Sequence, residues 1–212
     1  MFETVKRFGI AMKIKICGLR TPGDINAVNE AMPDYVGFIL TDGFKRSVDE
    51  ETVQFICKLL DPMIQRVGVF VNDDPARIKR LMYNGLIDIV QLHGDEDDEY
   101  INELKSGSGS IVKVFKVKEG FDLAKAENSP ADMIMFDAGE GSGETFNWDL
   151  IKGVKRPFIL AGGLGPGNIT KACEELKESG LYAVDMSSSV DIKGHKDPEL
   201  VMQAVNEAHS IA

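Results

Sequence analysis

The sequence predicts an α/β protein whose parallel strands close into a single (β/α)8 barrel. Short apolar strands alternate with helices at a spacing of roughly 20 to 30 residues, which indicates parallel pairing through right-handed crossovers. The chain contains eight such strand–helix units, the number that closes a barrel. An open doubly wound sheet is the alternative. Its Gly-x-Gly-x-x-Gly turn is absent after the first strand, where Cys17-Gly18-Leu19-Arg20 has one glycine.

The first strand, at residues 13–17, shows the alternation of a strand with two different faces. Ile14 and Ile16 lie on one face, and Lys15 and Cys17 lie on the other. In a barrel we expect the isoleucines to pack against helices and the other two side chains to point inward.

An inward-facing lysine needs an acidic partner, because an unpaired ammonium is costly to bury. We expect Asp185, on the last strand and so next to the first in a closed barrel, to pair with Lys15. The pair would place positive charge near Cys17 and favour its thiolate.

The remaining elements follow in order along the chain. Thr21-Pro22 begins the first helix with an N-cap and a first-turn proline, and Ile25, Val28 and Ala31 form its apolar stripe. The other predicted strands are 35–40, 65–71, 87–92, 111–117, 133–137, 158–161 and 182–186. The other predicted helices are 49–60, with Val53, Ile56, Leu59 and Leu60 on its inner face, then 74–82, 97–104, 121–127, 147–153, 167–178 and 198–210.

Composition limits the class of protein. At 212 residues and 43% hydrophobic, the chain is long enough for one domain, and we expect the barrel to span 12–212 after a short extension at 1–11. A net charge of −10 argues against a nucleic-acid or anionic-membrane partner. Three widely spaced cysteines fit neither a disulfide framework nor a metal site, and we find neither a signal peptide nor a membrane anchor, so we expect a cytoplasmic protein.

In a barrel the loops that follow the strands share one mouth, so residues at distant strand ends meet there. Cys17 ends the first strand and Asp137 the sixth, and they form a candidate base and acid, unless Cys17 is only a small buried hydrophobe and Asp137 only a loop cap. His93, after the fourth strand, is a second candidate base or a hydrogen-bonded wall residue. Arg46, with Lys45, is either a solvated loop residue or a ligand for a substrate carboxylate.

The last two strands end in a candidate phosphate site. Gly162 and Gly163 let the backbone approach a ligand closely, and the serine run at 187–189 starts a short helix with free N–H groups. Because the two loops are adjacent in a barrel, we expect Gly162, Gly163, Ser187 and Ser188 to bind phosphate through backbone dipoles. The alternative is that the glycines only make tight turns.

Segments along nearly the whole chain, in order, resemble phosphoribosylanthranilate isomerase. They are Lys-Ile-Cys-Gly-Leu at 15–19, Lys-Arg-Ser at 45–47, Val-Gly-Val-Phe at 67–70, Val-Gln-Leu-His-Gly at 90–94, Phe-Asp at 136–137, Thr-Phe-Asn-Trp at 145–148, Leu-Ala-Gly-Gly-Leu at 160–164, residues 185–190 and Gly-His-Lys-Asp at 194–197.

The resemblance implies a barrel enzyme of tryptophan biosynthesis that needs no cofactor or metal. It would convert N-(5-phosphoribosyl)anthranilate into 1-(2-carboxyphenylamino)-1-deoxyribulose 5-phosphate by an Amadori rearrangement. By motif, Asp137 is the acid that protonates the ring oxygen and Cys17 the base that removes the C2 proton. Arg46 would hold the anthranilate carboxylate, with His93 and Gly143 as further substrate contacts and the two phosphate loops on the 5-phosphate.

Two loops depart from the family pattern. The loop after the sixth strand carries Glu140 and Glu144 where the family has Gly-Gly-Thr-Gly, which adds negative charge near an anionic substrate. Ser189 stands where the family has glycine, so it must accept an unusual backbone angle or shift the phosphate turn.

Two other functions fit part of the sequence. A related phosphosugar enzyme would keep the phosphate loops without needing Arg46, and a non-catalytic phosphate binder would need neither Cys17 nor Asp137. The sequence leaves open whether the chain is a monomer or a homodimer.

Overall fold

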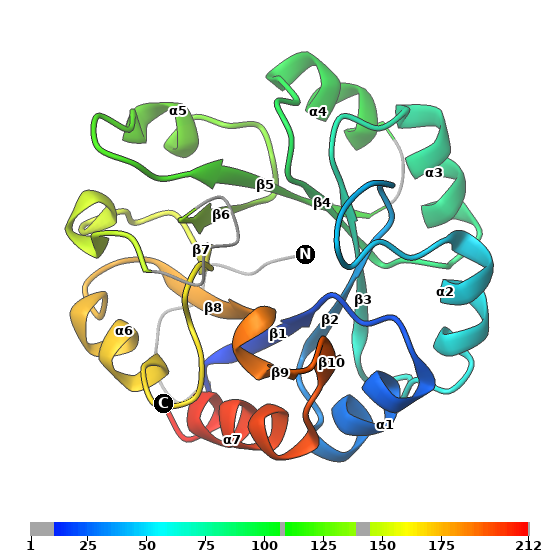
Figure 1. Cartoon of the computed structure of the whole chain (residues 1–212). Coiled ribbons are helices and arrows are strands. Elements are labelled where there is room, and N and C mark those ends of the chain that lie inside the picture. Colours follow the sequence, from blue (N-terminus) through cyan, green and yellow to red (C-terminus); the bar gives the residue numbers. More distant parts are fainter. Residues whose placement is uncertain (1–10, 107–108, 139–144, 212) are drawn as a thin grey trace.

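The structure, a computed structural model, describes residues 11–106, 109–138 and 145–211. Eight parallel strands form a closed barrel in sequence order, with β1 hydrogen-bonded to both β2 and β8 (Figure 1). The strands are β1 (Lys13–Cys17), β2 (Tyr35–Ile39), β3 (Gln65–Phe70), β4 (Ile89–Leu92), β5 (Ser110–Lys116), β6 (Met133–Asp137), β7 (Phe158–Leu160) and β8 (Leu181–Met186). Closure confirms the barrel and excludes the open doubly wound sheet.

Helices surround the barrel, as Figure 1 shows. They are α1 (Pro22–Ala31), α2 (Glu50–Cys57), α3 (Pro75–Tyr83), α4 (Asp98–Lys105), α5 (Leu123–Glu127), α6 (Ile169–Glu175) and α7 (Pro198–His209), with 3₁₀ turns η1 (Trp148–Ile151) and η2 (Ser188–Val190). Most begin at an Asp or Thr whose side chain accepts a hydrogen bond from the first turn, and α1, α3 and α7 start with proline.

Several predicted bounds were too long. The predicted helix at 147–153 is only the 3₁₀ turn η1, and α2 ends at Cys57 rather than at residue 60. Leu59 therefore lies beyond the helix and is 45% exposed, so its placement on the inner face was wrong, whereas Leu60 is buried.

The two faces of the strands divide the core as predicted. Ile14 and Ile16 belong to the apolar layer between strands and helices. A second apolar cluster fills the barrel and includes Val67, Ile89 and Val112. Among the described residues, no helix is long and apolar enough to cross a membrane.

One small sheet was not predicted. After η2 the chain forms an antiparallel hairpin of β9 (Asp191–Ile192) and β10 (His195–Lys196), which lies at the barrel mouth near β1 and β2 (Figure 1). Its turn residues, Lys193 and Gly194, both have positive φ, of 52° and 84°. Such a two-residue turn matches the twist of a hairpin.

Asp24, in the first turn of α1, holds this hairpin against the loop after β1. The carboxylate, which is 2% exposed, accepts the backbone N–H groups of Arg20, Thr21 and Lys196, each at 2.9 Å. Burial opposes its charge, but these N–H groups outweigh burial and lower the pKa of Asp24.

We expect Asp24→Asn to lower the free energy of unfolding by about 2 kcal/mol at pH 7, because an amide nitrogen would face a backbone N–H. Since the folded pKa is lowered, this stabilisation is present above about pH 4 and is lost as the pH falls further. Urea denaturation at pH 7 and pH 3 measures both effects. Asp49→Asn, at the exposed N-cap of α2, is the control, for which we expect a smaller loss; equal losses would contradict the assignment.

Candidate active site

Cys17 and Lys15 point from β1 into the barrel, where a glycine on β2 makes room for them. Cys17 pairs in register with Gly37. A Cβ at Gly37 would lie 2.6 Å from the Cys17 Sγ and 3.1 Å from the Lys15 Nζ. The thiol and the ammonium therefore occupy neighbouring positions inside the barrel.

Lys15 forms the predicted ion pair with Asp185 of β8. Its Nζ lies 2.9 Å from the Asp185 Oδ1, and both side chains are almost entirely buried. Burial opposes the charge on Lys15, but Asp185 and Cys17 outweigh it and raise the pKa of Lys15. The pair confirms the prediction, and its lysine is an ammonium at neutral pH.

The effect of this pair on Cys17 is smaller than expected. Burial raises the pKa of the Cys17 thiol, and the positive charges of Lys15 and Lys196 only partly offset it. The expectation that Lys15 favours the thiolate is right in sign, but burial dominates. At neutral pH the resting side chain is therefore mostly a thiol.

Asp137, the last residue of β6, lies beside His93. The His93 Nε2 is 3.6 Å from the Asp137 Oδ2, which is too long for a hydrogen bond. Burial lowers the pKa of His93, and Asp137 only partly offsets this, so the imidazole is neutral at pH 7. Two strands, β7 and β8, separate Asp137 from Cys17, so the two residues lie on different sides of the mouth.

Arg46 is neither solvated nor free. Its side chain is mostly buried, and its Nε and Nη2 donate to the Asp191 Oδ2 at 2.9 and 2.6 Å. Its stem crosses Gly18, where a Cβ would lie 2.6 Å from the Arg46 Cδ and where φ is +85°. Arg46 thus lies next to the loop that begins at Cys17, whereas Lys45 is exposed.

Asp191 and Lys196 were not predicted as site residues. The hairpin places Asp191 in contact with Arg46, and Lys196 in contact with Asp191. The Lys196 Nζ donates to the Asp191 Oδ1 at 2.6 Å and to the carbonyl of Ser187 at 2.9 Å. Arg20 also binds the hairpin, through the carbonyl of Gly194. Gly194 is the available signal, because glycine adopts the positive φ that a two-residue hairpin turn needs, whereas Lys193 is not a residue that such turns favour.

The loops after β7 and β8 are in contact, as the predicted phosphate site requires. A Cβ at Gly165 would lie 2.8 Å from the Ser189 Cβ. Ser187 donates its hydroxyl to the Cys17 carbonyl at 3.2 Å, and Ser188 begins η2, so the predicted short helix is a single 3₁₀ turn. The first N–H groups of such a turn have no helical acceptor and remain able to bind an anion.

The two glycines of this site differ. Gly162 and Gly163 have φ of +87° and +67°. A Cβ at Gly162 would lie 2.6 Å from the backbone nitrogen of Ala138, so this glycine serves close packing of β7 against β6. Both glycines thus have the backbone conformation of tight turns, and Gly162 in addition allows close packing of the two strand ends.

Of the two loops that depart from the family pattern, the structure describes the one that contains Ser189. Ser189 is not among the described non-glycine residues with positive φ, so it does not take an unusual backbone angle. Gly143, Glu140 and Glu144 lie outside the described residues.

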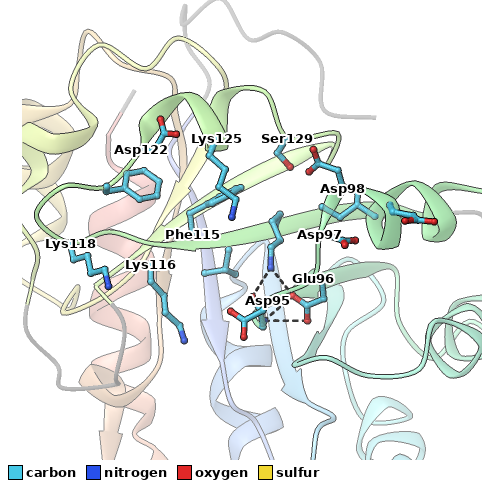
Figure 2. Close-up of a pocket in the computed structure, with 16 residues that line it drawn as sticks. Asp95, Glu96, Asp97, Asp98, Phe115, Lys116, Lys118, Asp122, Lys125 and Ser129 are labelled. Carbon is cyan, nitrogen blue, oxygen red and sulfur yellow. Dashed lines mark hydrogen bonds and ion pairs between the residues drawn. The ribbon is translucent and has the colours of Figure 1, made fainter.

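A cavity of about 720 Å³ lies between α4, β5 and α5 (Figure 2). Phe115 and Phe121 line it together with a mixture of carboxylates and amines, among them Asp98 and Lys125. Lys113, also in its lining, forms a buried ion pair with Glu96 at 2.6 Å. Neither Cys17 nor Asp137 lines this cavity, whose lining includes Gly94 and Lys118 from the loops after β4 and β5. Among the described residues, no group of three or more His, Cys, Asp or Glu could hold a metal ion.

Comparison of the sequence and of the fold with known proteins identifies one family. The family model described as "N-(5'phosphoribosyl)anthranilate (PRA) isomerase" matches residues 14–207. An N-(5'-phosphoribosyl)anthranilate isomerase of Endomicrobium trichonymphae is 42% identical over 205 residues, covering 94% of this chain and 99% of the relative. The crystal structure of the Thermotoga maritima phosphoribosyl anthranilate isomerase is similar with a TM-score of 0.85 at 31% identity, covering 94% of this chain and all of that one.

A further similar structure is a phosphoribosyl anthranilate isomerase in complex with reduced 1-(o-carboxyphenylamino)-1-deoxyribulose 5-phosphate. It has a TM-score of 0.81 at 30% identity and covers 94% of this chain and all of that one. The matches extend over nearly the whole barrel. This chain is therefore an isomerase of the phosphoribosylanthranilate isomerase family, which acts in tryptophan biosynthesis.

Proposed function

We propose that this chain converts N-(5-phosphoribosyl)anthranilate into 1-(2-carboxyphenylamino)-1-deoxyribulose 5-phosphate by acid–base catalysis at the barrel mouth. The observation that carries the proposal is that a thiol, Cys17, and a carboxyl, Asp137, end two strands of one barrel, with a mostly buried Arg46 next to the loop after Cys17. Membership of the family indicates the substrate. The residue types at Cys17 and Asp137 indicate the acid–base chemistry.

The substrate has two anionic ends, and the mouth has a group suited to each. The adjoining loops after β7 and β8 offer backbone N–H groups of Gly162, Gly163, Ser187 and Ser188 to the 5-phosphate. On the side of β2, Arg46 offers its remaining N–H groups to the anthranilate carboxylate. Binding at both ends would hold the ribose between Cys17 and Asp137, with His93 beside Asp137.

The acid step opens the sugar ring. Asp137 donates a proton to the ring oxygen while the anilino nitrogen forms a double bond to C1, and the bond between C1 and the ring oxygen breaks. A protonated Schiff base results, and its positive charge makes the C2 proton more acidic.

The base step moves hydrogen without a cofactor. The Cys17 thiolate takes the C2 proton, and the electron pair forms the C1–C2 double bond of an enolamine. A proton then adds at C1 while the C2 hydroxyl loses its proton, which gives the ketone at C2, so C1 is reduced and C2 is oxidised within one molecule. Lys15 and Lys196 favour the thiolate against the effect of burial.

The direct test is turnover of freshly generated N-(5-phosphoribosyl)anthranilate, followed by the loss of its fluorescence. We expect the wild type to turn over and Cys17→Ser and Asp137→Asn each to lose about 100- to 10,000-fold in kcat. Cys57→Ser, which changes a thiol on α2 away from the mouth, is the control and should keep full activity. A folded wild type without turnover would contradict the proposal.

Alkylation tests the state of the thiol without substrate. We expect the rate at which iodoacetamide modifies Cys17 to rise about tenfold per pH unit through neutral pH, with a midpoint above the ordinary cysteine pKa, because burial disfavours the thiolate.

A double variant, Lys15→Met with Asp185→Asn, should move this midpoint to still higher pH, since Lys15 has the larger effect on Cys17. Mass spectrometry of the Cys17 peptide separates its modification from that of Cys57 and Cys173. A midpoint that stays or falls in the double variant would be inconsistent with the assigned role of Lys15.

A further inference from the structure

The hairpin β9–β10 delivers two charged side chains to the mouth, neither of which transfers a proton in the proposed chemistry. Asp191 is the first residue of β9 and Lys196 the last of β10, and the two pair in register. The Lys196 side chain is 1% exposed, and that of Asp191 is 6% exposed. Burying two charges is costly, so a buried pair in a surface hairpin calls for an explanation beyond stability.

The pair is completed by Arg46, from a different loop. One Asp191 oxygen, Oδ2, accepts both the Nε and the Nη2 of Arg46, and the other oxygen, Oδ1, accepts the Lys196 Nζ. A single buried carboxylate therefore lies between two cations. The net charge of the three groups is positive, which favours the approach of an anion.

The contacts of Arg46 leave one side of its guanidinium available. A guanidinium has five N–H donors, and Asp191 uses one on Nε and one on Nη2. No acceptor among the residues that the structure describes binds Nη1. The edge formed by Nη1 and Nη2 can bind a second carboxylate with two parallel hydrogen bonds.

Lys196 connects this unit to Cys17. Its Nζ also donates to the carbonyl of Ser187, whose hydroxyl donates to the carbonyl of Cys17. Asp24 fixes the backbone of Lys196, so the hairpin cannot shift without breaking contacts to α1. The orientation of Arg46 and the position of Cys17 are therefore set by one connected group of residues.

We propose that Asp191 and Lys196 are positioning residues, which hold the Arg46 guanidinium so that its Nη1–Nη2 edge meets the substrate carboxylate. The proposal rests on the proposed function, because that function supplies the carboxylate. A hairpin with only a structural role would stabilise the barrel without affecting substrate affinity through Arg46.

A double-mutant cycle distinguishes the two roles. We expect Asp191→Asn to raise KM for N-(5-phosphoribosyl)anthranilate about tenfold, with kcat changed less than about threefold, because a freely rotating guanidinium loses its bidentate geometry. In an Arg46→Ala background the same substitution should raise KM less than about twofold. Lys196→Met should raise KM in the same direction as Asp191→Asn.

Asp88→Asn is the matched control. Asp88 binds the Nε and Nη2 of Arg66, at 2.9 and 2.7 Å, where β3 and β4 begin, at the end of the barrel opposite the mouth. We expect its KM to equal that of the wild type. If Asp191→Asn does not fold, the double variant Asp191→Asn with Lys196→Met removes one charge of each sign and takes its place in the cycle.

The outcomes separate the two proposals. Equal rises in KM with and without Arg46, or no rise at all, would overturn the positioning role while leaving the proposed function intact. A folded wild type without turnover would overturn both.

Discussion

The buried ion pair between Lys15 and Asp185 is the interaction on which the rest of the structure depends. It joins the first strand to the last, so it lies across the closure of the barrel. Removing one partner of such a pair typically costs about 3–5 kcal/mol, because the other charge is left buried and unpaired. The same ammonium lies beside Cys17, so closure of the barrel and the charge around the candidate base are linked.

Charge at the mouth is arranged in one ion pair and one cluster of three charged groups, rather than as an excess of unpaired lysines. Lys15 with Asp185, and Arg46 and Lys196 with Asp191, keep each cation in one orientation inside an acidic protein. Fixed donors need no reorganisation when an anionic ligand binds. Cys17 lies buried beside these charges, and its burial disfavours the thiolate.

Strand alternation and loop order were enough to predict the barrel, the inward direction of Lys15 and Cys17, and the partner of Lys15. These properties follow from local periodicity and from closure alone. Two features could not be predicted from periodicity. The bond from Arg46 to Asp191 depends on a hairpin whose strands have two residues each, too short for a period-two signal. The pKa of Cys17 depends on how completely the barrel excludes water, which a sequence pattern does not measure.

The most direct test of the central claim is a crystal structure of this protein with reduced 1-(o-carboxyphenylamino)-1-deoxyribulose 5-phosphate. The account predicts the phosphate at the loops after β7 and β8 and the carboxylate on the Nη1–Nη2 edge of Arg46. It also predicts that Cys17 and Asp137 lie on opposite sides of the ligand's carbon chain. A ligand bound with its carboxylate away from Arg46, or with Cys17 out of contact with its C2, would contradict the account.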